Sequence, residues 1–208
     1  MRSRLLAVVL VALFSAACTK SEAGQPSAAG RGDSTPPSPS GKSSGSQTPT
    51  VAIPPRPKAL RLDGLEPCDL FTAPQLAQIK IDRKRKGTSN AEHYQGMKDC
   101  ALDENSAPFD HYSILAVTNE GIGPWLSGNR NVEGHLSSVA GYAAATYWIR
   151  GANGNHTDGC TTSIDIADGQ QLMVDADNDG KHSYTLEQLC QRAEQVGGFA
   201  VQTLQTLK

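Results

Sequence analysis

The positions of the five cysteines constrain this chain of 208 residues more than any other feature. Cys18 closely follows an apolar run from Leu5 to Phe14, and two arginines precede that run. A basic start, a short apolar run and small residues at the cleavage point are typical of an export signal. The ten apolar residues are too few for a lasting transmembrane helix, which needs about 20. We therefore expect a lipoprotein signal peptide over residues 1–17, with Cys18 as the lipidated first residue of the mature chain.

An ordinary signal peptide cut near Ala17, with Cys18 incidental, is the alternative interpretation of this leader. Both interpretations place the rest of the chain outside the cytoplasm. A cysteine that carries two or three acyl chains would also hold it stably at a membrane. The expected location is the extracytoplasmic face of the cell membrane, with the N-terminal lipid as anchor.

Gly, Ser, Pro, Thr and Ala dominate the segment after Cys18, and no aromatic residue occurs between Phe14 and Phe71. Such a segment cannot bury enough apolar surface to offset the entropy lost on ordering. We expect residues 18–64 to form a disordered tether. Residues 65–208 then have the usual size of a single folded domain.

Four cysteines remain for that domain: Cys68, Cys100, Cys160 and Cys190. They are widely separated and lack the closely spaced pairs of a zinc site, so two disulfides are expected in an exported domain. Three connectivities are available to four cysteines. The sequential one, Cys68–Cys100 with Cys160–Cys190, is preferred because each bond would join a predicted helix to a predicted strand.

The pattern of the folded part favours an α+β domain. Residues 112–118 alternate as in a strand, and Asp168-Gly169 is typical of a hairpin turn. Thr72 and Thr185 each precede a glutamine by three residues, which indicates two helix starts. We predict an antiparallel sheet of about five or six strands covered by two main helices. By analogy at the level of fold, it is comparable to the PsbP/Mog1-like sandwich.

Residues 82–86, Asp-Arg-Lys-Arg-Lys, form a basic run with two interpretations. The run could contact anionic lipid or a wall polymer. A solvated strand end or turn is the more common explanation of such a run.

Asp175, Asp177 and Asp179 precede Gly180 with the spacing of a calcium loop. The loop would need a bidentate glutamate at its twelfth position, where Leu186 stands. Calcium is therefore only a weak candidate, and an acidic turn between a strand and a helix explains the residues more simply. No metal or other cofactor is predicted.

Motifs of known chemistry are missing from the folded part of the sequence. Residues 65–208, the expected folded domain, contain no Gly-x-Ser-x-Gly elbow and no His-Glu-x-x-His zinc motif. A net charge of −2 gives no reason to expect nucleic acid as a partner. The leading hypothesis is a non-enzymatic binding or interaction module for an envelope protein, wall or small-molecule partner. An envelope hydrolase that uses carboxylates such as Asp165, Asp175 or Asp177 is the alternative, and a calcium-dependent adhesion module is the third.

Residues 66–72, Glu-Pro-Cys-Asp-Leu-Phe-Thr, resemble the Asp-Pro-Cys-x-Leu-Leu-Thr opening of the actinobacterial lipoproteins catalogued as domain of unknown function 3558. Residues 139–144 are similar to the Val-x-Gly-x-Pro-Ala segment of that family, and the resemblance resumes around Cys160 and Cys190. It implies export, lipid attachment, two disulfides and an actinobacterial host. The family has no established activity, so the resemblance implies no catalytic residues.

Overall fold

The computed structural model describes residues 51–104, 110–151, 159–178 and 184–207. Cys18 lies outside these ranges, as do the expected signal peptide and most of the expected tether. Within the described ranges, no helix is both long and apolar enough to cross a membrane.

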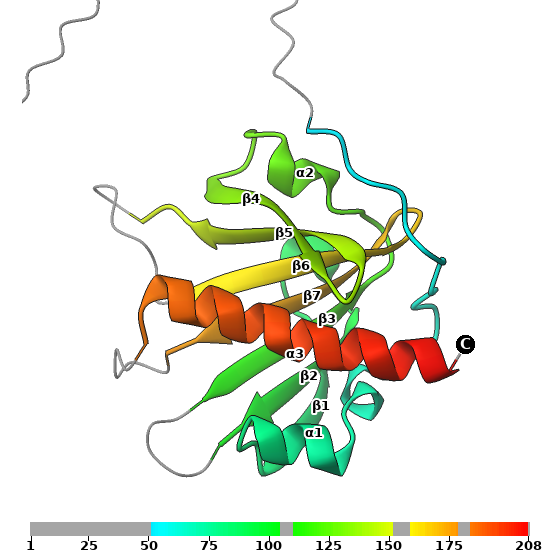
Figure 1. Ribbon diagram of the computed structural model, residues 1–208, viewed down its shortest axis with the longest axis vertical. Helices are drawn as coiled ribbons and strands as arrows, with labels where there is room; N and C mark the ends of the chain where they lie inside the picture. Colours follow the sequence, from blue (N-terminus) through cyan, green and yellow to red (C-terminus); the bar gives the residue numbers. More distant parts are fainter. Residues whose placement is uncertain (1–50, 105–109, 152–158, 179–183, 208) are drawn as a thin grey trace, which may run out of the picture. The chain divides into compact units, whose positions relative to one another are not determined.

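Seven strands form one antiparallel sheet in the order β1-β2-β3-β7-β6-β5-β4 (Figure 1). The first three strands form one meander and the last four another, and pairing of β3 with β7 joins the two. The strands β1 and β4 are therefore the two edges of the sheet. Their bounds are β1 Arg83–Thr88, β2 Lys98–Asp103, β3 His111–Val117, β4 Val132–Val139, β5 Tyr142–Ile149, β6 Gly159–Ala167 and β7 Gln170–Asp177.

The sheet has more strands than the five or six expected from the sequence. The strand β1 is exposed along its whole length and four of its six residues are basic, so no apolar alternation marked it. The strand β4 begins inside a Gly-rich segment whose composition is typical of a loop. In both strands, pairing with a buried neighbour decides the conformation.

One long helix, α3 (Leu186–Leu207), crosses the sheet, and the prediction of two main helices is wrong. The first predicted helix, α1, ends after six residues (Ala73–Gln78) because the chain reverses at Lys80, which adopts a positive φ of 58°. The other helical segments are also short. They are η1 Pro67–Leu70, η2 Glu92–Tyr94 and α2 Gly123–Leu126.

The helix α3 begins with the predicted capping box. The Thr185 backbone N–H donates to the Gln188 side chain, and the Gln188 N–H donates to the Thr185 hydroxyl. One stripe of α3 then packs on the helix side of the sheet, where the main core lies. The stripe consists of Leu189, Ala193, Val196, Gly197, Ala200, Val201 and Leu204.

Both disulfides have the sequential connectivity that the sequence favours. Cys68–Cys100 joins η1 to β2, and Cys160–Cys190 joins β6 to α3, with Cα atoms 5.0 Å apart in each pair. The first bond thus ties η1 to the sheet, and the second ties α3 to it. They also suggest an extracytoplasmic domain, since disulfides persist in oxidising compartments.

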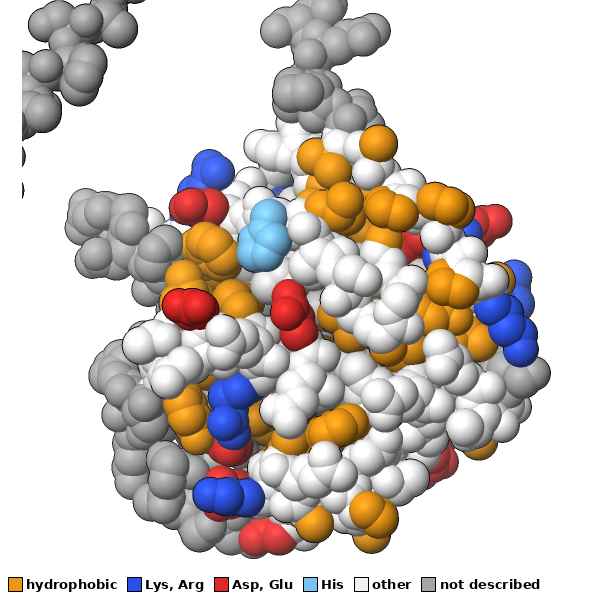
Figure 2. All heavy atoms as spheres, in the orientation of Figure 1, with side chains coloured by type: hydrophobic (Ala, Val, Ile, Leu, Met, Phe, Trp, Pro, Cys, Tyr) orange, Lys and Arg blue, Asp and Glu red, His pale blue; other side chains and the backbone are white. Residues whose placement is uncertain are grey.

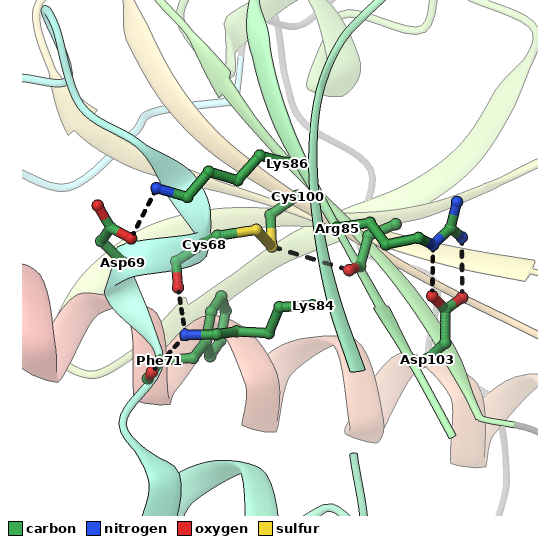
Figure 3. Close-up of a disulfide and its surroundings, with 9 residues drawn as sticks. Cys68, Asp69, Phe71, Lys84, Arg85, Lys86, Cys100 and Asp103 are labelled. Atoms are coloured by element: carbon green, nitrogen blue, oxygen red, sulfur yellow. Dashed lines mark hydrogen bonds and ion pairs between the residues drawn. A yellow bond between two sulfur atoms is a disulfide. The ribbon is translucent and has the colours of Figure 1, made fainter. Parts of the chain in front are cut away.

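The basic run becomes the edge strand β1, whose cations are paired within the domain (Figure 3). On one side of the strand, Lys84 donates to the carbonyl oxygens of Cys68 and Phe71, and Lys86 lies 3.0 Å from Asp69. On the other side, Arg85 makes a two-point contact with Asp103. Charged side chains on an edge strand also discourage pairing with other chains.

The packed part begins before residue 65, where the folded domain was expected to start. Leu60 and Leu62 are at most 1 % exposed and belong to the main core. The Leu60 N–H donates to the carbonyl of Ile166, and the Leu62 N–H donates to Gln170. We call residues 51–64 the strap, because they hold the start of the domain against the β6–β7 hairpin.

Candidate functional site

The face of the sheet away from α3 divides into an apolar half and a polar half. Because side chains alternate along a strand, His111 and Ser113 lie on this face while Tyr112 and Ile114 point to the main core. We call the polar part the polar half-face. It consists of Asp103, His111, Ser113, Thr161, Asp175 and Asp177.

Asp103 anchors one end of the polar half-face. Its Oδ1 lies 2.8 Å from Nδ1 of His111, while Arg85 approaches both carboxylate oxygens at 2.8 and 3.1 Å. The hydrogen bonds from Arg85, with that from His111, hold the pKa of Asp103 well below its usual range although burial opposes them. Asp103 is therefore a fixed anion that orients His111 through Nδ1, leaving Nε2 as the ring nitrogen that can meet a ligand.

Asp175 lies in a different environment on β7, which is separated from β2 by β3. Register places Asp175 between Ser113 of β3 and Thr161 of β6, and the Thr161 hydroxyl donates to its Oδ1 at 2.7 Å. Burial raises the pKa of Asp175, and the charge of Asp177 raises it further. The carboxylate is thus held where its ionised form is poorly solvated.

Gly159 lies beside the two carboxylates of β7. A Cβ atom at Gly159 would lie 3.5 Å from Cβ of Asp177 and 3.8 Å from Oδ1 of Asp175. Asp175 and Asp177 are therefore both next to a position without a side chain.

An aromatic and ionic cluster covers the other half of this face. The rings of Trp125 and Tyr147 stack with centroids 4.2 Å apart, and the Arg130 guanidinium lies 3.9 Å from the Trp125 centroid. Arg130 reaches Glu120 at 2.5 Å, and the Tyr94 hydroxyl donates to the same carboxylate at 2.9 Å. Burial raises the pKa of Tyr94 to about 12, so this hydroxyl keeps its proton as a donor.

Two of the three carboxylates singled out in the sequence come together, and the third does not. Asp175 and Asp177 share the polar half-face, since they are two residues apart on β7. Asp165 lies toward the other end of β6, where Arg56 of the strap approaches both of its oxygens at 2.8 Å. Asp179 lies outside the described residues. Among the residues that are described, no three His, Cys, Asp or Glu side chains are placed to bind one metal ion.

Sequence reasoning missed Asp103, His111 and Arg85 as members of one group. Each belongs to a different strand, and only the register of β1, β2 and β3 brings them together. The alternation of residues 111–117 did contain a signal, because it set His111 and Ser113 on the side opposite the apolar residues. Nothing in the sequence indicated which strand would lie beside them.

The arrangement offers mainly hydrogen-bond acceptors to a ligand. Two carboxylates, a serine hydroxyl and a histidine ring nitrogen lie beside Gly159 or adjoin it through the strand register. Such a set complements hydroxyl or ammonium donors. The opposite pKa shifts of Asp103 and Asp175 are also what an acid–base pair requires.

The structure is a single α+β domain with two disulfides, which suggest that the domain is extracytoplasmic. The chain belongs to the family described as protein of unknown function DUF3558, whose sequence profile matches residues 13–203. No curated protein and no solved structure matches the chain.

Proposed function

We propose that the protein is a lipid-anchored, extracytoplasmic binding module whose ligand lies on the polar half-face. The single observation that carries the proposal is the partial burial of unlike polar groups on the sheet face that α3 leaves uncovered. The Thr161 hydroxyl holds the Asp175 carboxylate in place through a hydrogen bond, and Asp103 orients the His111 ring. Groups fixed in this way are pre-organised, which lowers the entropy lost when a ligand binds.

The acceptor-rich chemistry favours a ligand with several hydroxyl or amino groups, and wall glycan is the class that fits best. Carboxylates accept hydrogen bonds from hydroxyl and amino groups. These charge-assisted hydrogen bonds are stronger than hydrogen bonds between neutral groups. The proposed location beside the cell wall is consistent with this class.

Binding to purified, insoluble cell-wall sacculi tests the proposal. We expect wild-type protein to sediment with sacculi and Asp175→Asn to lose most of this binding, because the amide keeps the shape and removes the charge. The matched control is Glu133→Gln, which removes an exposed carboxylate on β4 paired opposite Trp148, on the helix side of the sheet. Equal sedimentation of all three proteins, or none by the wild type, would refute the proposed ligand class.

A hydrolase is the second candidate function, and the convergence of Asp175 with Asp177 favours it. One carboxyl group with a raised pKa could donate a proton, while the oriented His111 could accept one. Release of soluble sugar or peptide from the same sacculi measures this activity. An activity that survives Asp175→Asn contradicts the assignment of Asp175 as the acid.

Lipid attachment at Cys18 is the part of the proposal that determines location. Metabolic labelling with an alkyne fatty acid should mark the wild type and leave Cys18→Ala unmarked. Labelling of Cys18→Ala would refute it.

Calcium-dependent adhesion remains a third proposal, based on Asp175 and Asp177 with Asp179 outside the described residues. A rise in melting temperature with millimolar Ca²⁺ would support it, and an unchanged melting temperature would remove it. The PsbP/Mog1-like resemblance also remains a proposal at the level of fold, supported by the antiparallel sheet with one long terminal helix.

A further inference from the structure

A second recess lies between the strap and the segment that leads into α2. Its volume is about 700 Å³, which is within the range of small-molecule sites. The strap supplies most of the wall, and Gly121, Ile122, Gly123 and Asp165 supply the rest. This recess is separate from the polar half-face, so a ligand bound in it would be independent of the function proposed there.

The wall of the recess combines apolar side chains with polar groups. It contains Ile53, Ile122 and three prolines of the strap. Val51 and Ile53 are 40 % and 38 % exposed, and only two other large hydrophobic side chains in the described ranges are exposed. Figure 2 shows apolar side chains gathered at the top of the molecule, where Figure 1 places α2 and the strap. Exposed apolar groups that adjoin a recess are typical of a binding site.

The two cations of the recess wall, Arg56 and Lys58, differ in their pairing. Arg56 is neutralised, because it pairs with Asp165 at 2.8 Å and also with Asp168. Lys58 is exposed and has no ion-pair partner among the described residues. A ligand that enters would therefore meet the apolar side chains of the strap and the free ammonium group of Lys58.

We propose that the recess binds an anionic amphiphile, a molecule with an apolar chain and one carboxylate or phosphate group. The chain would lie against Ile53 and the prolines of the strap, and the anionic group would pair with Lys58. Because the strap forms most of the wall, the ligand would also hold the strap to the hairpin that Arg56 already contacts.

Titration calorimetry on the mature chain with three ten-carbon probes below their micellar concentrations tests this assignment. Decyl phosphate should bind, and decanol should bind about five-fold more weakly, because it lacks the charge that pairs with an exposed lysine. Decyltrimethylammonium should bind more weakly still. Lys58→Gln should reduce the affinity for decyl phosphate to that for decanol, whereas Lys80→Gln, which removes an exposed lysine outside the recess wall, should leave it unchanged.

Several results would overturn the assignment. Equal affinity for the three probes would remove the charge preference, and equal effects of Lys58→Gln and Lys80→Gln would place the anion elsewhere. Binding to phosphatidylglycerol vesicles without binding to monomeric decyl phosphate would show a lipid surface rather than a recess as the partner. No binding to any probe would reject the site, and an unchanged melting temperature of Lys58→Gln verifies that the variant is folded.

Discussion

Asp103 and Asp175 lie on the same sheet face, yet their surroundings shift their pKa values in opposite directions. Asp103 receives hydrogen bonds from Arg85 and His111, which favour its ionised form. Asp175 is desolvated and has Asp177 as a neighbour, which disfavour its ionised form. The first carboxylate therefore stabilises the fold at neutral pH, whereas the second weakens it.

Asp175→Asn should make the protein more stable at pH 7, by roughly 1 kcal/mol. The pKa of Asp175 is raised on folding, so its ionisation lowers stability as the pH rises above the unfolded value of about 3.9. The advantage of the variant should vanish below pH 4, where both states hold the proton. Urea unfolding at pH 7 and pH 3.5 measures both effects. A variant that is less stable than wild type at pH 7 would contradict the prediction.

Asp103→Asn should have the opposite effect and lower the free energy of unfolding by about 1 kcal/mol at pH 7. The value is small because Arg83 and Arg85, which pair with Asp103, are about half-exposed. The pKa of Asp103 is lowered on folding, so its contribution is present above the unfolded pKa and is lost as the pH falls through the folded value. The same urea experiments should show the deficit shrink at low pH. A deficit that is equal at both pH values would mean that packing, rather than charge, is responsible.

At the scale of elements, two neighbouring glycines of α3 have different surroundings. A Cβ atom at Gly197 would lie 2.7 Å from Cδ1 of Ile164, a fully buried side chain of β6. A Cβ atom at Gly198 would lie 3.9 Å from Val139, which is an ordinary contact. Gly197 therefore permits the close approach of α3 to the sheet, and Gly198 does not need to be glycine.

Gly198→Ala should stabilise the protein by about 0.5–1 kcal/mol, because alanine is the better helix former. Gly197→Ala should leave the free energy of unfolding unchanged or lower it by about 1 kcal/mol, because Ile164 must move within a packed core. Thermal unfolding of the two variants side by side provides the measurement, and each serves as the control for the other. Similar shifts in melting temperature for both would show that α3 does not pack as closely as described.

At the scale of the whole molecule, the strap joins the expected tether to the core. Leu60 and Leu62 are buried as completely as the residues of α3, although they belong to no helix or strand. Arg56 adds an ion pair to Asp165, and Gln170 contacts both Leu62 and Asp63. The domain is therefore attached to its N-terminal segment by packing, not only by the peptide chain.

A chain that starts at residue 65 should be less stable than one that starts at residue 51, by about 3 kcal/mol or more. Each buried leucine contributes about 1.5–3 kcal/mol, part of which is offset by the entropy lost in ordering the strap. Urea unfolding of the two shortened chains compares their stabilities directly. Equal midpoints would mean that the strap contributes nothing to the core.

The sequence predicted those features that depend on local patterns. Thr185 and Gln188 marked the start of α3, and Asp168-Gly169 marked the β6–β7 turn. The four cysteines of the domain form the preferred pairs. In contrast, β1 and the strap carry few local signals, since a basic edge strand and a proline-rich segment resemble solvated chain.

The sequence by itself determined the α+β class, the family and the disulfide-bonded domain, because periodicity, caps and cysteine positions are properties of short segments. Only the tertiary structure decided that Arg85, Asp103, His111 and Asp175 share one face, since strand order and register bring together residues from four strands. It also decided that Leu60 and Leu62 belong to the core. Burial and charge pairing depend on residues that are distant in the sequence. For this reason Asp175 contacts Thr161 on the polar half-face, whereas Asp165 pairs with Arg56 of the strap.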